Sequence, residues 1–209
     1  MIDVGLPLTD GVFLFHIEPE GSLVIERTEW GLAGGKIRAE GVSIDSRSAR
    51  HKFVLEVEGV DLQKLAALAK VEGLTVTGRL SGDIPVLIEE GSLIIREGLL
   101  ETTLKGGTVR YNPSEIPSAL RYGGERTRLV LSALKNFQYE TLRIKLDRRS
   151  DGNEKVSLQF HGSNPDFFKG RPVDLNLNLS GLLDQMLQRG LNIYKIPETI
   201  IKRFQKFGR

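Results

Sequence analysis

Apolar and polar residues alternate with a period of two over most of the chain. The alternation is clearest in three successive runs, 142–146, 156–160 and 173–179, where polar residues separate the aliphatic or aromatic ones. Such alternation places the two sets of side chains on opposite faces of a β-strand. The Asp151–Gly152 turn between the first two runs predicts a hairpin. Together the runs present ten apolar positions: Leu142, Ile144, Leu146, Val156, Leu158, Phe160, Val173, Leu175, Leu177 and Leu179.

Strand-like sequence also fills the first half of the chain. Residues 11–58 alternate in the same way, and residues 74–113 form short apolar runs separated by glycines. Glycine bends or ends strands, so closely spaced runs of this kind predict successive strands of an antiparallel meander. One face of such a sheet is buried and the other is wet.

Helical spacing of apolar residues appears in two short segments, 61–70 and 126–135, and again in the tail, 182–209. Asp61 is placed to cap the first helix. We therefore expect a mainly β protein, with an extended, curled antiparallel sheet and short helices over residues 1–181. A C-terminal amphipathic helical tail follows over residues 182–209.

The last helix of the tail is basic, and three arrangements remain open for it. It can lie on an anionic membrane surface, pair with another subunit, or pack its apolar stripe against the sheet. The stripe consists of Ile200, Ile201, Phe204 and Phe207.

Composition limits the classes of function. The chain has 209 residues, of which 40% are apolar, and its 29 basic and 27 acidic residues give a net charge of +2. This balance does not predict a nucleic-acid binder, which needs a strong basic excess. The absence of cysteine excludes disulfides and thiolate metal sites.

The lengths of the apolar runs and the sequence of the N-terminus indicate how the chain relates to membranes and to processing. No apolar run reaches the ~18 residues that span a bilayer, and the N-terminus lacks the basic and apolar regions of a signal peptide. Strand-like sequence follows Met1 at once. We therefore expect Met1 to be an expression start, and the chain to be a piece of a longer protein.

No residue pattern predicts catalysis. His16, His51 and His161 are far apart, and none has a metal-ligating partner at helical or loop spacing. Adjacent carboxylates such as Glu89 and Glu90 point to opposite faces of a strand. The sequence shows no nucleophile motif or phosphate-binding loop in the required setting, so we expect no enzyme activity, catalytic residue, metal or cofactor.

The connection 164–173 is the most unusual local sequence, with two prolines, two phenylalanines and two bases. It is either a binding loop or a strand connection whose phenylalanines close one end of the core. We favour the second interpretation.

The apolar face of the sheet needs a cover or a ligand. A second layer would bury it in an ordinary domain, whereas a curled sheet leaves an apolar groove that marks a ligand or partner site. Acyl chains suit such a groove, since burying each CH₂ is worth about 0.8 kcal/mol. A bare sheet edge would also favour dimerisation of the chain through strand pairing.

Three stretches carry a resemblance to a known family: 82–86 (GDIPV), 136–142 (NFQYETL) and 162–176 (GSNPDFFKGRPVDLN). In these, the chain resembles the C-terminal region of the YdbH-type proteins, which belong with TamB and YhdP among the AsmA-like proteins. The resemblance covers most of the chain and is weakest before residue 60 and over the last two dozen residues.

The resemblance implies a periplasmic segment of a bridge that carries phospholipids between the inner and outer membranes of Gram-negative bacteria along a hydrophobic β-groove. The full-length protein would be anchored in the inner membrane. A small outer-membrane lipoprotein that adds strands to an open edge is an implied partner. The family has no catalytic residues, and the ten alternating apolar positions are the candidates that line the groove.

The alternative is a non-enzymatic structural or assembly module of the envelope. It would bind protein partners through its sheet edges and tail helix, around a closed, dry core. Lipid that co-purifies with the chain distinguishes the two functions.

Overall fold

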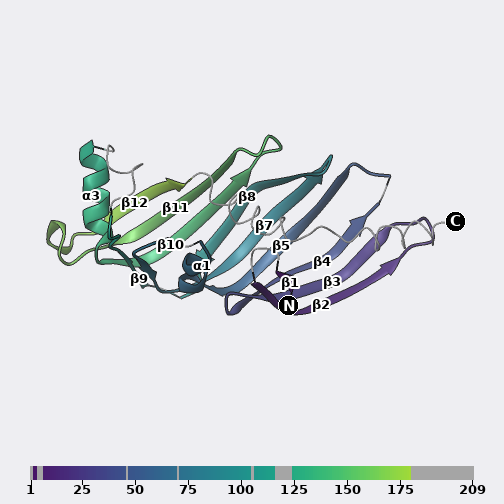
Figure 1. Cartoon of the computed structure of the whole chain (residues 1–209), viewed down its shortest axis with the longest axis horizontal. Coiled ribbons are helices and arrows are strands. Elements are labelled where there is room, and N and C mark those ends of the chain that lie inside the picture. Colours follow the sequence, from purple (N-terminus) through teal and green to yellow (C-terminus); the bar gives the residue numbers. More distant parts are fainter. Residues whose placement is uncertain are drawn as a thin grey trace.

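A single antiparallel β-sheet of twelve strands dominates the protein, in agreement with the expected mainly β fold (Figure 1). The strand order along the sheet is β1-β2-β3-β4-β5-β7-β8-β10-β11-β12, and the short strands β6 and β9 pair beside β10. The computed structural model describes residues 2–3, 7–45, 47–69, 71–104, 106–115 and 124–179.

The strands have the following bounds. They are β1 (Ile2–Asp3), β2 (Pro7–Ile17), β3 (Leu23–Leu32), β4 (Gly35–Ile44), β5 (Arg50–Asp61), β6 (Leu74–Val76), β7 (Arg79–Glu89), β8 (Ser92–Thr102), β9 (Gly107–Tyr111), β10 (Phe137–Arg148), β11 (Glu154–Ser163) and β12 (Val173–Leu179). The helices are α1 (Leu62–Ala69) and α3 (Gly124–Leu134), and a 3-10 turn covers Phe168–Gly170.

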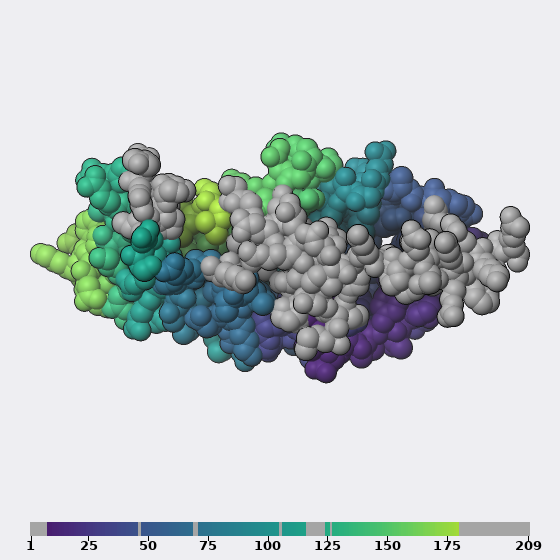
Figure 2. Space-filling model, viewed as in Figure 1, coloured from purple at the N-terminus to yellow at the C-terminus, as the bar shows by residue number. Residues whose placement is uncertain are grey.

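The sheet is open, as the sequence predicts. Strands β1 and β12 stand at its two ends, and each pairs with a neighbour on one side within the described residues. Figure 2 shows the resulting elongated molecule, with the connection between β11 and β12 at the extreme end away from β2. Strand β12 therefore exposes one edge of backbone groups in the described part of the chain.

Irregular pairing bends the sheet. The register shifts between Val57 and Val60 and again between Asp83 and Val86. Gly82 precedes the second shift with φ +148°, and a Cβ at this position would lie 2.1 Å from the Leu99 carbonyl oxygen. Bulges of this kind increase the local twist and curl a sheet.

Both helices occupy the segments in which helical spacing predicts them. The Asp61 carboxylate caps α1, since Oδ1 accepts hydrogen bonds from the backbone N–H groups of Gln63 (2.9 Å) and Lys64 (3.1 Å). Leu62 of α1 and Leu134 of α3 are buried in the main hydrophobic cluster. The predicted tail and its boundary after residue 181 lie outside the described residues.

An aromatic cluster lies in the core where β10 pairs with β9 and β11. Phe137 and Tyr139 are among the largest fully buried side chains. The Phe160 ring contacts both edge-on, at centroid distances of 6.2 and 6.0 Å. The Tyr139 hydroxyl donates to the Thr77 carbonyl oxygen, and burial raises the pKa of this phenol.

Candidate functional site

The ten apolar positions of the sequence analysis lie on one face of strands β10, β11 and β12. The pairing register joins them into rows that run across the strands. Directly paired residues share a face of the sheet, so the register places the whole set together. The rows are Leu142–Phe160–Leu175, Ile144–Leu158–Leu177 and Leu146–Val156–Leu179, and Val173 lies opposite Gly162.

Burial varies systematically across these rows. Leu142, Phe160 and Leu175 are buried against the α3 end of the core. The middle row is half-buried, and Leu179 at the sheet edge is 38% exposed. The middle row and Leu179 therefore offer accessible apolar surface beside buried residues of the neighbouring rows.

The same apolar face continues into strands that the sequence analysis did not select. Leu100 of β8 pairs with Ile144, and Gly82 of β7 connects Leu100 to Val57 of β5. Val57 and Leu100 belong to the same hydrophobic cluster as Leu142. Their apolar runs are visible in the sequence, but the bulges in β5 and β7 hide which residues share a face with β10.

The opposite face of the sheet is polar and charged. Arg143 binds Glu101 of β8 at 2.5 Å, and Ser157 donates to the Asn178 side chain at 2.8 Å. A depression of about 600 Å³ opens on this face beside His161. The polar face is thus suited to water and not to hydrocarbon.

His161 is an exposed partner of Asp174 on that polar face. Its Nδ1 lies 2.7 Å from Asp174 Oδ1, and this hydrogen bond raises the pKa of the imidazole. His16 lies on β2, 2.9 Å from Glu26, and His51 lies on β5. The three histidines therefore occupy separate strands.

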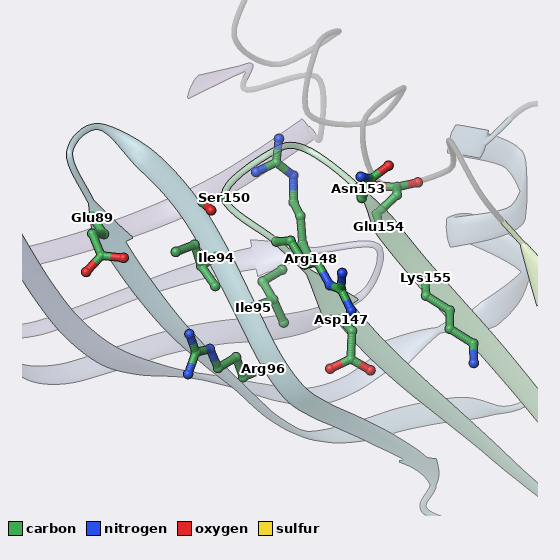
Figure 3. A pocket seen from close by; sticks show the side chains of 11 residues that line it. Glu89, Ile94, Ile95, Arg96, Asp147, Arg148, Ser150, Asn153, Glu154 and Lys155 are labelled. Atoms are coloured by element: carbon green, nitrogen blue, oxygen red, sulfur yellow. The ribbon is translucent and has the colours of Figure 1, made fainter.

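A charged row borders the apolar rows at one rim of the sheet. Arg148 and Glu154 form the next pair on the same face after Leu146 and Val156, two residues further along the strands. The Arg148 guanidinium donates to the Leu93 carbonyl oxygen at 2.5 Å. Figure 3 shows Arg148 beside Ile95, between the ends of the β7–β8 and β10–β11 hairpins.

A cavity of about 660 Å³ lies between these two hairpin ends, and its lining mixes charges with apolar groups. Arg96, Arg148, Arg149 and Lys155 contribute cations, Glu89, Asp147 and Glu154 contribute carboxylates, and Ile94 and Ile95 contribute apolar surface. An apolar face that ends in a rim with both charges is complementary to an amphipathic ligand with a polar headgroup. The sequence analysis missed this rim because only the pairing register brings the two hairpins together.

A family model described as YdbH-like, intermembrane phospholipid transport protein YdbH, matches residues 1–205. The chain belongs to the YdbH-like family. No curated protein and no solved structure gives a significant match to it. Membership confirms the resemblance in the sequence and gives the chain a role in lipid transport between membranes, and with it a place in the cell envelope.

The YdbH-like family is defined by transport and not by a chemical reaction. In the described part of this YdbH-like chain, no three His, Asp or Glu side chains are grouped to hold a metal ion. Neither of the described helices has the length and apolarity that crossing a bilayer requires.

The two phenylalanines of the connection between β11 and β12 differ in burial. Phe167 is half-buried and packs against the hydrophobic cluster, as the strand-connection interpretation expects. That interpretation is wrong for Phe168, which is 58% exposed. Buried Asn164 ties the connection to α3 through a hydrogen bond to the Ala133 carbonyl oxygen, and Phe168 has a left-handed backbone conformation beside the packed Phe167.

Proposed function

We propose that the apolar face of this sheet carries phospholipid acyl chains, and that the chain is a periplasmic segment of a bridge between the inner and outer membranes. The observation that carries the proposal is the continuous register of apolar residues from β5 to β12, with the half-buried row Ile144–Leu158–Leu177 at its centre. The ten apolar positions of β10, β11 and β12 are the proposed lining.

The dimensions of the face fit an acyl chain. Across the strands, the apolar rows continue for five strand-to-strand steps from β5 to β12, or roughly 24 Å at about 4.8 Å each. Along β10, the first apolar row at Leu142 lies six residues from the charged row at Arg148, or roughly 20 Å at about 3.3 Å per residue. The acyl layer of one leaflet is roughly 15 Å thick, half of the bilayer core. Contacts with CH₂ groups are non-directional, so a lipid can slide from one strand to the next at nearly constant free energy.

The charged rim supports a position for the headgroup. Arg148 and Glu154 lie on the same face as Leu146 and Val156, two residues further along the strands. A lipid whose acyl chains lie along the strands, across the apolar rows, would place its phosphate near the guanidinium, and the amine of a zwitterionic headgroup near the carboxylates. Charge-assisted hydrogen bonds to phosphate are the strong interactions at such a rim.

The exposed edge of β12 supports the partner part of the proposal. A small outer-membrane lipoprotein can extend the sheet by adding a strand to this edge, which would also prolong the apolar rows. The full-length protein would be held in the inner membrane. A second copy of the chain pairing at the same edge is the competing occupant.

Native mass spectrometry of the purified chain, followed by lipid extraction, tests the proposal. We expect phospholipid at a defined ratio, and its loss in Leu158→Glu, which places a charge in the middle row. Gln159→Glu is the matched control, because Gln159 pairs with Arg143 and Asn176 on the polar face. A lipid-free protein with a cooperative thermal transition would overturn the proposal in favour of an envelope assembly module with a dry core.

A further inference from the structure

The loop between β11 and β12, residues 164–172 (the β11–β12 loop), presents an aromatic side chain to solvent. Phe168 is 58% exposed and is the most exposed aromatic residue that the structure describes. Its ring contacts the half-buried Phe167 ring edge-on, with centroids 4.5 Å apart. The loop lies at the extreme end of the molecule, beyond the last paired strands (Figures 1 and 2).

The backbone holds Phe168 outward at an energetic cost. Phe168 and Lys169 both have left-handed conformations, with φ values of 50° and 56°. Bulky L-residues seldom adopt this conformation, and such strain persists where the surroundings impose it. Hydrogen bonds from Gly170 N to the Phe167 carbonyl oxygen (3.0 Å) and from Arg171 N to the Phe168 carbonyl oxygen (3.2 Å) close the turn.

A buried amide fixes the base of the loop to α3. Asn164 is 2% exposed, and its Nδ2 donates to the carbonyl oxygens of Ala133 (2.8 Å) and Ser132 (3.3 Å) at the end of the helix. Its Oδ1 accepts from the backbone N–H of Asp166 at 2.8 Å. The hydrogen bonds of this buried side chain therefore hold the base of the loop against α3, and the turn that carries Phe168 extends from this base.

Two cationic residues follow Phe168 in the loop. Lys169 and Arg171 are exposed, and no ion pair joins either to a described residue. The one acidic residue of the loop, Asp166, accepts a hydrogen bond from the Asn136 side chain at 2.9 Å. An exposed aromatic ring beside such basic side chains has the composition of a membrane-interface anchor.

We propose that the β11–β12 loop is a docking tip for a bilayer that contains anionic phospholipid. Phe168 enters the boundary between headgroups and acyl chains, and Lys169 and Arg171 bind lipid phosphates. The inference rests on the proposed transport function, to which it adds a point of delivery. Val173, the first apolar residue of β12, follows the loop directly, so a docked tip brings the apolar rows to the membrane surface.

Vesicle flotation tests the docking tip, using phosphatidylcholine vesicles with and without a fraction of phosphatidylglycerol. Phe168→Ala should reduce binding to the mixed vesicles roughly five- to fifteenfold, the value of burying the exposed part of a phenylalanine ring. Lys169→Asn with Arg171→Gln should reduce it by about fivefold for each base and remove the dependence on phosphatidylglycerol and salt. Asparagine at 169 keeps the left-handed backbone acceptable.

The matched control is Phe13→Ala, the same substitution at a 45% exposed ring on β2, towards the other end of the sheet. It should leave flotation unchanged, and Phe168→Trp should retain binding with a blue-shifted emission on adding vesicles. Equal losses in Phe13→Ala and Phe168→Ala, or wild-type protein that stays unbound, would overturn the docking tip. Lipid bound to each variant, measured by native mass spectrometry, separates this outcome from failure of the transport function.

Discussion

A carboxyl group placed in the middle apolar row tests the character of this face. Leu158 is half-buried between Ile144 and Leu177. Leu158→Glu removes about half of the 1.5–3 kcal/mol that full burial of a leucine contributes. Partial burial also disfavours the carboxylate, so we expect the introduced group to have a pKa about one to two pH units above the usual ~4.3.

The sign of the pH dependence follows from that raised pKa. The variant is most stable where the carboxyl is protonated, and it loses stability as the pH rises through the raised pKa. The loss is about 1.4 kcal/mol for each pH unit that separates the folded-state pKa from the unfolded-state pKa. Lipid binding should follow the same titration, because a neutral carboxyl tolerates an acyl chain better than a carboxylate. We therefore expect Leu158→Glu to lose lipid at pH 7 and to regain part of it near pH 4.

Urea unfolding at a series of pH values, together with lipid quantification, measures both effects. Gln159→Glu should change the free energy of unfolding by no more than about 0.5 kcal/mol and should retain lipid at every pH. The reasoning fails if Leu158→Glu binds lipid at pH 7 as the wild type does, or if both variants lose lipid to the same extent.

Three further substitutions test the fold and its electrostatics. Asp61→Ala should destabilise the protein by about 1 kcal/mol in urea unfolding, because α1 loses the two hydrogen bonds of its cap. Phe137→Ala should cost about 3–5 kcal/mol in the same assay, since its ring is fully buried, and a loss below about 1 kcal/mol would contradict the described core. The hydrogen bond that His161 donates to the Asp174 carboxylate raises the pKa of the imidazole, so Asp174→Asn should return this pKa towards 6.5 in an NMR titration. The stability that this exposed pair adds is present below the ordinary histidine pKa and is lost as the pH rises through the raised value.

The period of two predicted the two-faced sheet, because the alternation of apolar and polar residues is contained in each strand's own sequence. In the runs 142–146, 156–160 and 173–179 every second residue is apolar, and the register pairs these apolar residues with one another. The extension into β5 and β7 was not predictable in this way. The bulge after Gly82 depends on a backbone conformation and on close approach to Leu99, neither of which is encoded in an apolar–polar pattern.

In the β11–β12 loop, too, the sequence pattern does not predict which of two residues is buried. Phe167 and Phe168 are identical in chemistry and adjacent in sequence, yet one packs on the core and the other faces solvent. The base of this loop is held by Asn164, which binds carbonyl groups of α3 about thirty residues earlier in the chain, a contact that the local pattern does not contain. The charged rim has a similar origin, since Arg148 and Leu93 meet through tertiary pairing alone.

The order of the strands allows the length of the sheet, measured across its strands, to change by insertion or deletion of hairpins. From β1 to β5, and again from β10 to β12, each strand pairs with its sequence neighbours, so adding or removing a hairpin alters the sheet without rethreading the rest. Two strands change the reach by roughly 10 Å, and the chain leaves the new hairpin in the direction in which it entered. A single strand would instead reverse that direction and move the next turn to the opposite rim. Gain and loss of paired strands is therefore a simple evolutionary route by which the length of a sheet of this design can change.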